Sequence, residues 1–187
     1  MERLALFQLL FFVVFPLWIL AGLGDWWCHR RTHIETTSGL KESLMHSLMM
    51  FEIAVPVLVG LFFEITPAIL LFMIGCLVLH QLTAFWDLSS TMQHRYISPL
   101  EQQVHSLLEI LPLCALLIVC ALNWEAVTSL TTPSAFPIKG LQLKANPIPI
   151  SYLLPLLTAI TLLLVLPFGE ELLRSHQARY QKVPPTS

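Results

Sequence analysis

The sequence contains few charged residues and no excess of either sign. Asp, Glu, Lys and Arg make up 12% of the 187 residues, about half of the roughly 25% found in ordinary soluble domains. With 10 basic and 12 acidic residues, the net charge of -2 provides no basic surface that would neutralise a phosphate backbone. We therefore expect no nucleic-acid binding. A soluble enzyme is also disfavoured, because 56% of the residues are hydrophobic.

Cysteine motifs are also absent, and no cleavable leader is expected. The four cysteines show no C-x-x-C spacing, so neither a disulfide framework nor a zinc ribbon is predicted. The first apolar run is longer than a signal-peptide core and has no Ala-x-Ala cleavage site, which favours a retained membrane helix. The cysteines, each in or beside an apolar run, are Cys28, Cys76, Cys114 and Cys120.

Long hydrophobic runs dominate the rest of the sequence. Five apolar segments of roughly 18 to 24 residues each approach the ~20 residues that a helix needs to cross a bilayer. Because a backbone in hydrocarbon must satisfy its own hydrogen bonds, these segments are expected to be helices. The predicted fold class is all-α, an integral membrane helical bundle with five transmembrane helices in a single domain, 1–187. The expected spans are about 4–27, 43–63, 66–88, 102–123 and 150–168, with an external loop at 124–149 and a cytosolic tail at 169–187.

Two helix starts are predicted from capping residues. Thr66 places a hydroxyl immediately before Pro67, and Ser98 precedes Pro99 with Glu101 three residues after the serine. A hydroxyl cap followed by a first-turn proline is typical of a helix N-terminus, and the second pattern is a capping box. The third and fourth helices are therefore expected to begin near these points.

Basic residues are distributed unevenly between the two ends of the predicted bundle. Three lie on the N-terminal side and seven on the other, so the positive-inside rule places the N-terminus outside and the C-terminus in the cytoplasm. The expected location is a bacterial inner membrane. The three are Arg3, Lys139 and Lys144, and the seven are Arg30, Arg31, Lys41, Arg95, Arg174, Arg179 and Lys182.

All seven histidines fall on or near the predicted cytoplasmic side, and carboxylates accompany them at helical spacing. Residues four or seven apart share one face of a helix, as in Asp25-His29-His33 and Glu101-His105-Glu109. Imidazole and carboxylate donors without a cysteine pair suit non-haem iron or manganese better than structural zinc. The predicted metal ligands are Asp25, His29, His33, Glu42, His46, His80, Asp87, His94, Glu101 and His105.

Other ionisable residues are expected to support this site. An ionisable side chain at the centre of a membrane helix costs about 2.5–3.5 kcal/mol, so Glu52 and Glu109 are expected to face the bundle, where they support the ligands or transfer protons. Arg30, Arg31 and Arg95 are expected to anchor the cytosolic interface or to bind an anionic head group. The seventh histidine, His176, with Glu170 and Glu171, is interpreted as part of a solvated tail.

The His29-Arg-Arg-Thr-His33 pentad, set among membrane helices with further histidines on the same side, resembles the membrane-bound histidine-rich di-iron hydroxylases and desaturases of the fatty-acid hydroxylase type. That family carries about eight histidines in H-x3-4-H and H-x2-3-H-H boxes. The present chain has one H-x3-H box, no adjacent His-His pair and seven histidines. The resemblance implies two iron ions that activate oxygen against a lipid or other apolar substrate, with carboxylates in place of some histidines.

Several alternatives follow from the same residues. Manganese or zinc would replace iron in a related metal site. Two histidines on facing helices would serve as axial ligands of haem in a membrane electron carrier. Glu52, Glu109 and His80 would be steps of a pathway in a metal or proton transporter. An assembly factor would use the polar end to bind a partner. An oxygenase also requires a redox partner, in addition to the lipid bilayer and a lipid substrate.

Overall fold

The computed structural model describes residues 2–131 and 141–181, and it confirms the all-α membrane bundle. Five helical segments are long and apolar enough to cross a membrane. The first consists of α1 (Glu2–Leu9), a π-helical turn η1 (Leu10–Val14) and α2 (Phe15–Thr32); the next three are α3 (Leu40–Phe62), α4 (Pro67–Thr91) and α5 (Pro99–Leu122). The fifth consists of α7 (Ile150–Ile160), a π-helical turn η4 (Thr161–Val165) and α8 (Leu166–Gln181). The remaining elements are a short 3-10 turn η2 (Ile34–Thr36) and a short helix α6 (Trp124–Ser129).

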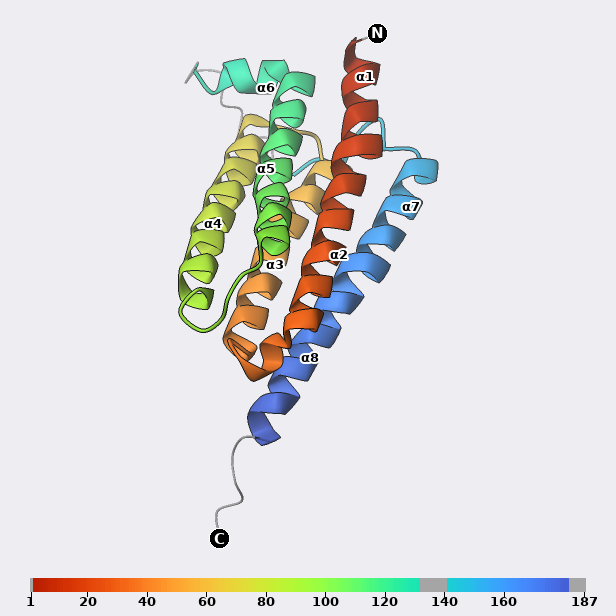
Figure 1. Cartoon of the computed structure of the whole chain (residues 1–187). Helices are drawn as coiled ribbons and strands as arrows, with labels where there is room; N and C mark the ends of the chain where they lie inside the picture. Colours follow the sequence, from red (N-terminus) through yellow and green to blue (C-terminus); the bar gives the residue numbers. More distant parts are fainter. Residues whose placement is uncertain (1, 132–140, 182–187) are drawn as a thin grey trace.

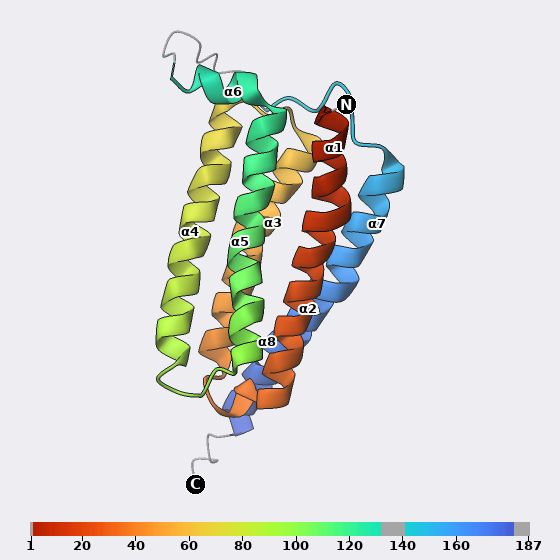
Figure 2. The same cartoon turned by 45° about the horizontal axis from the view of Figure 1, so that its top comes forward.

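The long helices alternate in direction, so the N-terminus and the C-terminal end of α8 lie at opposite ends of the bundle (Figure 1). Helix α3 packs against α4 and α8, and α2 packs against α5 and the turn η4. The short helix α6 lies across the end of the bundle that carries the N-terminus, as both views show (Figures 1 and 2). The opposite end is therefore formed by the ends of α2, α4 and α8 and the starts of α3 and α5.

The predicted helix starts are confirmed at both capping sites. The Thr66 hydroxyl accepts a hydrogen bond from the backbone N–H of Ile69 at 3.3 Å, and the Ser98 hydroxyl accepts one from the N–H of Glu101 at 3.2 Å. Each cap satisfies an N–H group that has no partner within its own helix. The cap at Ser98 begins α5 at the end of the bundle where the buried polar residues lie.

Other boundaries differ from those expected. Helix α4 continues to Thr91, and α8 continues to Gln181, so residues expected in a tail after 168 belong to a membrane-length helix. Nothing between Glu170 and Gln181 interrupts it, since that stretch contains neither proline nor glycine. Part of the expected external loop forms α6. Residues 132–140 of that loop, including Lys139, lie outside the described residues, as does Lys182.

A tight reversal brings the end of α2 next to the start of α3. His33 ends α2 in the left-handed conformation, with φ of 51°, and its N–H bonds to the carbonyl of His29. Gly39 also has a positive φ, 64°, which a residue without a Cβ adopts without strain. Between them Ile34 is fully buried, so it anchors the turn against the bundle. This turn positions the polar residues of α2 and α3 side by side.

The bundle has a hydrocarbon surface and a partly polar interior. Large apolar side chains such as Phe51 and Phe85 are 65% and 72% exposed, which is typical of a lipid-facing surface. The interior between the spans contains an apolar core that includes Trp18 and Leu164. At Gly22 a Cβ atom would collide with Cδ2 of Leu164, so the glycine permits close contact between α2 and η4.

Candidate metal centre

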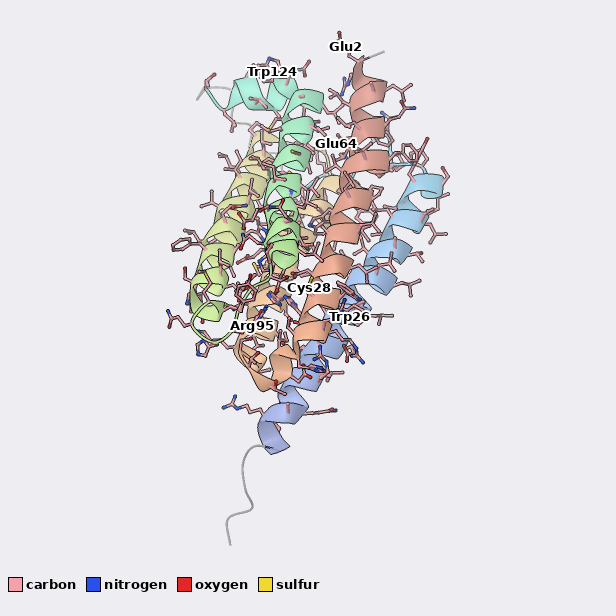
Figure 3. All side chains as sticks on the ribbon, in the orientation of Figure 1. Glu2, Trp26, Cys28, Glu64, Arg95 and Trp124 are labelled. Atoms are coloured by element: carbon pink, nitrogen blue, oxygen red, sulfur yellow. The ribbon has the colours of Figure 1, made fainter. Side chains whose placement is uncertain are left out.

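Ionisable side chains are buried at the end of the bundle opposite the N-terminus. Figure 3 shows the labelled Trp26, Cys28 and Arg95 towards this end, whereas Glu2, Glu64 and Trp124 lie towards the other. Every one of the five spans contributes at least one buried acid or imidazole here. The set, which we call the buried polar cluster, comprises Asp25 and His29 from α2, Glu42 and His46 from α3, Asp87 from α4, Glu101 and His105 from α5, and Glu171 from α8.

His29 lies at the centre of the cluster, with no exposed surface. Its Nε2 atom is 3.4 Å from Oδ1 of Asp25, 3.5 Å from Oε1 of Glu101 and 3.8 Å from Oε1 of Glu42. Despite this crowding, His29 Nε2 has no hydrogen-bond partner, and Asp25 Oδ1 contacts Nε2 of His105 without the geometry of a hydrogen bond. Buried polar atoms are seldom left in this state, because an unsatisfied group incurs its full desolvation cost. A bound cation would satisfy several of these atoms at once.

Separations between neighbouring donor atoms also fit a metal site. Oδ1 of Asp25 is 2.9 Å from Nε2 of His105, and Oδ2 of Asp87 is 3.1 Å from Nε2 of His46. Donor atoms that lie 2.0–2.2 Å from an ion at tetrahedral or octahedral angles are about 3.0–3.5 Å apart. Three groups have all their donor atoms within 4.8 Å of one another, and each contains His29. The partners of His29 in the groups are Asp25 with His105, His46 with Glu171, and Glu42 with Glu101.

Glu171 connects the two central histidines from the side of α8. Its Oε2 is 2.9 Å from Nδ1 of His29, and its Oε1 is 3.1 Å from Nδ1 of His46. The two imidazole rings stack with centroids 4.4 Å apart and planes at 5°. An ionised carboxylate only accepts hydrogen bonds, so each Nδ1 must carry the proton. In a neutral ring Nε2 then keeps its lone pair for a metal, which is the usual arrangement for ligating histidines. Nε2 of His46 lies 3.1 Å from Oδ2 of Asp87, so without an ion between them it donates a hydrogen bond to that carboxylate and the ring is protonated at both nitrogens.

Arg95 lies among the acids rather than at the surface. Its Nη2 donates to Oε1 of Glu42 and to Oε1 of Glu101, each at 2.5 Å, and its side chain is 4% exposed. Burial lowers the pKa of the Arg95 guanidinium, but the hydrogen bonds that it donates to Glu101 and Glu42 outweigh that effect and raise the pKa above its ordinary value. Arg95 was expected at the interface or on a head group, and here it is a fixed positive charge inside the cluster.

The charges of the cluster do not balance without a further cation. It contains five buried carboxylates and one buried guanidinium, Arg95, which leaves four negative charges when the histidines are neutral. Two divalent cations would supply four positive charges. Protonation of all three imidazoles would supply three and would remove the Nε2 lone pairs. The donor set, the unsatisfied atoms and the charge are therefore all consistent with two divalent ions.

A second polar pair lies deeper in the membrane region. Nδ1 of His80 is 3.9 Å from Oε2 of Glu52, and neither atom has a hydrogen-bond partner. The Thr83 hydroxyl donates to the other Glu52 oxygen at 2.9 Å. His80 and Glu109 line a cavity of about 80 Å³, and the same cavity, which we call the polar cavity, reaches the cluster. Its cluster residues are Asp25, His46, Asp87 and His105.

Three predicted ligands do not join the cluster, because His80 lies deeper beside Glu52 and the other two lie at the surface. His33 is exposed and contacts Glu35, with 3.3 Å between Nδ1 and Oε1. The left-handed turn at His33 ends the helical periodicity that would have placed it on the face of His29. His94 is also exposed, and its Nδ1 bonds to the Ser90 carbonyl at 2.8 Å. It follows the end of α4 at Thr91, so it is not on the helical face of Asp87.

The remaining sites that we expected are at the periphery. Arg30 forms an ion pair with Glu170, and the guanidinium of Arg31 lies 4.7 Å from the centre of the Trp27 ring. His176 packs against Tyr180. Sequence reasoning missed Glu171, because residues after 168 were assigned to a tail. The uninterrupted stretch of helix-forming residues from Glu170 onwards was the signal that α8 continues.

No family model, curated protein or solved structure matches the chain. The function of the chain is therefore inferred from the arrangement of its own residues.

Proposed function

We propose that the chain is a membrane di-iron oxygenase of the hydroxylase or desaturase type, which acts on a lipid or other apolar substrate. The observation that carries this proposal is the convergence of imidazoles and carboxylates from all five spans on His29, with unsatisfied donor atoms and four uncompensated negative charges. Iron is favoured over zinc because the donors are imidazole and carboxylate without thiolate, and manganese is the closest alternative.

The cluster divides into two sides around the stacked imidazoles. One ion would be held by Asp25, His29 and His105, with Glu42 and Glu101 beside it. Arg95 partly neutralises the negative charge of these two glutamates. His46 and Asp87 would contribute to the second. Glu171 holds the tautomer and orientation of both central histidines. Two bound irons would supply reductive activation of oxygen, for which electrons must come from a redox partner at this end of the bundle.

The polar cavity provides a water-poor space beside the cluster. Apolar side chains such as Met49, Leu108 and Phe168 line it together with the ionisable residues. They exclude water and therefore strengthen electrostatic interactions at the cluster. The His80 and Glu52 pair, 3.9 Å apart, is suited to hold a proton at the side of the cavity remote from the cluster. We place this end of the molecule in the cytoplasm, in agreement with the excess of basic residues there.

Two of the alternative functions are less consistent with this geometry. The rings of His29 and His46 are stacked face to face at 4.4 Å, which leaves no space between them for the porphyrin that bis-histidine ligation requires. A transporter requires a polar path through the bundle. The cavity beyond Trp18 and Ile53 is instead lined mainly by hydrocarbon. These observations support an oxygenase over a haem carrier or an ion pathway.

The first test is the metal content and visible spectrum of the detergent-purified protein after expression with iron. The expected result is about two irons per chain without a Soret band. The exposed His176 gives a matched control for His29, so His176→Ala retains the iron whereas His29→Ala loses it. A Soret band, or a protein that binds no metal under any growth condition, would contradict the proposal. Lipid oxidation by the iron-loaded protein, supplied with oxygen and a chemical reductant, then tests the reaction itself.

A further inference from the structure

An apolar cavity of about 280 Å³ lies in the half of the bundle remote from the buried polar cluster. It is lined by residues of α1, η1, α2, α3, α4 and α5, and most of its lining is aromatic or aliphatic. Trp18 and Ile53 line both this apolar cavity and the polar cavity, so the two spaces are neighbours. The apolar cavity therefore extends from the end of the bundle that carries the N-terminus to side chains that also border the polar cavity.

Local irregularities of three helices border the apolar cavity. Residues Leu10, Phe11 and Val14 of the π-helical turn η1 line it, as do Pro56 within α3 and Pro112 within α5. Prolines and π-helical turns interrupt regular helix geometry, and π-turns are frequent at functional sites. Empty apolar cavities forfeit packing contacts and destabilise a protein in proportion to their volume. An apolar occupant would restore these contacts.

The polar residues of the apolar cavity lie at one end only. Asn123 ends α5, and the backbone N–H of Lys144 donates to the carbonyl of Phe62 at the end of α3, so both are at the end of the bundle that carries the N-terminus. Lys144 is partly buried. Burial lowers the pKa of the Lys144 ammonium, and the nearby Glu64 opposes that effect. Asn146 lines the cavity beside it.

We propose that the apolar cavity binds one alkyl chain of an amphiphile with an anionic head group, which Lys144 and the two asparagines contact. The chain then extends towards Trp18 and Ile53, so its far end, and not the head group, approaches the polar cavity. The cavity is nearly twice the ~150 Å³ of an engineered core cavity that binds benzene, so it accommodates roughly ten to twelve carbon atoms. This inference rests on the proposed function, because it assigns the substrate class and its orientation.

Heavy-atom quenching of Trp18 tests the orientation. The sample is the iron-free chain that retains Trp18 as its one tryptophan, in phosphatidylcholine vesicles. Two probes are compared: 12-bromododecanoate carries bromine at the far end of its chain, and 2-bromododecanoate carries it beside the head group. We expect saturable quenching by the first, displaced by unlabelled dodecanoate, and much weaker quenching by the second. If the single-tryptophan variant does not fold, the difference in quenching between the unsubstituted protein and Trp18→Phe reports on Trp18 instead. Stronger quenching by the 2-bromo compound, or none by either, would overturn the proposal.

Matched variants test the two ends of the cavity. Lys144→Gln should weaken dodecanoate binding about tenfold, whereas Lys41→Gln, which alters an exposed lysine at the opposite end, should not. Ala115→Phe places a ring in the cavity and should abolish binding, whereas Ala68→Phe adds the same ring on the exposed surface of α4. Unchanged binding in both Lys144→Gln and Ala115→Phe would overturn the assignment.

The source of the amphiphile is distinguished by a second probe. If phosphatidylglycerol brominated at the chain end quenches Trp18, and Lys144→Gln abolishes that quenching, the occupant is an anionic bilayer lipid. If only the free carboxylate quenches Trp18, the occupant is a free amphiphile. Both results agree with an anionic head group at Lys144. Equal quenching by brominated phosphatidylcholine contradicts it. These assays use iron-free protein, so they are independent of metal binding. If the protein binds two irons but not the amphiphile, only this inference is overturned. If the protein binds the amphiphile but never binds metal, only the metal proposal is overturned.

Discussion

The half of the bundle that contains the candidate metal centre buries ionisable side chains, whereas the half that contains the apolar cavity buries hydrocarbon. In the first half carboxylates and imidazoles contact one another, several of their buried atoms have no hydrogen-bond partner, and Glu171 bonds to two imidazoles at once. In the second half the helices are irregular at η1, Pro56 and Pro112, and a cavity remains between them. This difference is the one expected if, as we propose, one half binds metal ions and the other binds an apolar molecule.

The largest effect is expected when the central imidazole is removed. His29→Ala deletes the one residue shared by all three potential ligand groups, so the iron content should fall from about two per chain to near zero. Inductively coupled plasma mass spectrometry of the purified variant measures this loss. His29→Ala that retains both irons would show that the cluster is a network of ion pairs and not a metal site.

Removal of the buried cation should destabilise the metal-free protein strongly. Arg95→Gln leaves Glu42 and Glu101 without their partner, which should lower the free energy of unfolding by about 3–5 kcal/mol. Thermal unfolding in detergent, followed by circular dichroism, measures the change. Iron should restore much of the lost stability, because the same carboxylates can then ligate. Arg31→Gln, which removes an exposed guanidinium beside Trp27, is the control, and its effect should be below about 1 kcal/mol. Equal losses in the two variants would contradict the account.

Glu171 and Glu170 provide a test within one helical turn. Glu171→Gln keeps the size of the side chain, but its amide has one oxygen in place of two, so one imidazole loses its acceptor. Loss of such a support typically lowers metal affinity about 10–100-fold. Glu170→Gln removes the ion pairs with Arg30 and Arg174 and alters the hydrogen bond from Trp26, none of which involves a cluster residue, so it should leave the affinity unchanged. Competition with a chromogenic chelator measures both. Identical affinities in the two variants would show that Glu171 does not orient the ligands.

The smallest effect is expected at the exposed histidine of the predicted pentad. His33→Gly places glycine at a left-handed position, with φ of 51°, and should stabilise the protein by about 1 kcal/mol without loss of iron. A loss of iron in this variant would make His33 a ligand and would break the distinction between buried and exposed histidines. Thermal unfolding and metal content on the same preparation give both readouts.

The fold could be predicted from the sequence because membrane length and capping are local properties. The five spans and the caps at Thr66 and Ser98 are confirmed, since apolar run length and a hydroxyl before proline require no tertiary information. The end of the last helix could not be placed from hydropathy. Helix α8 leaves the apolar run at Gly169 and continues as a polar helix, which a search for hydrophobic runs does not detect.

The candidate site was predicted as a region better than as a set of residues. Helical spacing correctly indicated that Asp25 and His29, and likewise Glu42 and His46, share faces, and these residues do meet in the cluster. Spacing failed to locate His33 because the helix ends there in a left-handed residue. It also could not show that Arg95 turns inward, because the position of a loop residue depends on how α4 and α5 pack.

Anomalous X-ray diffraction from crystals grown with iron, measured above and below the iron absorption edge, tests the central claim most directly. The account predicts two anomalous peaks within the buried polar cluster, close to Nε2 of His29 and Nε2 of His46. No peak there, or iron only beside the exposed His33 and His94, would contradict it.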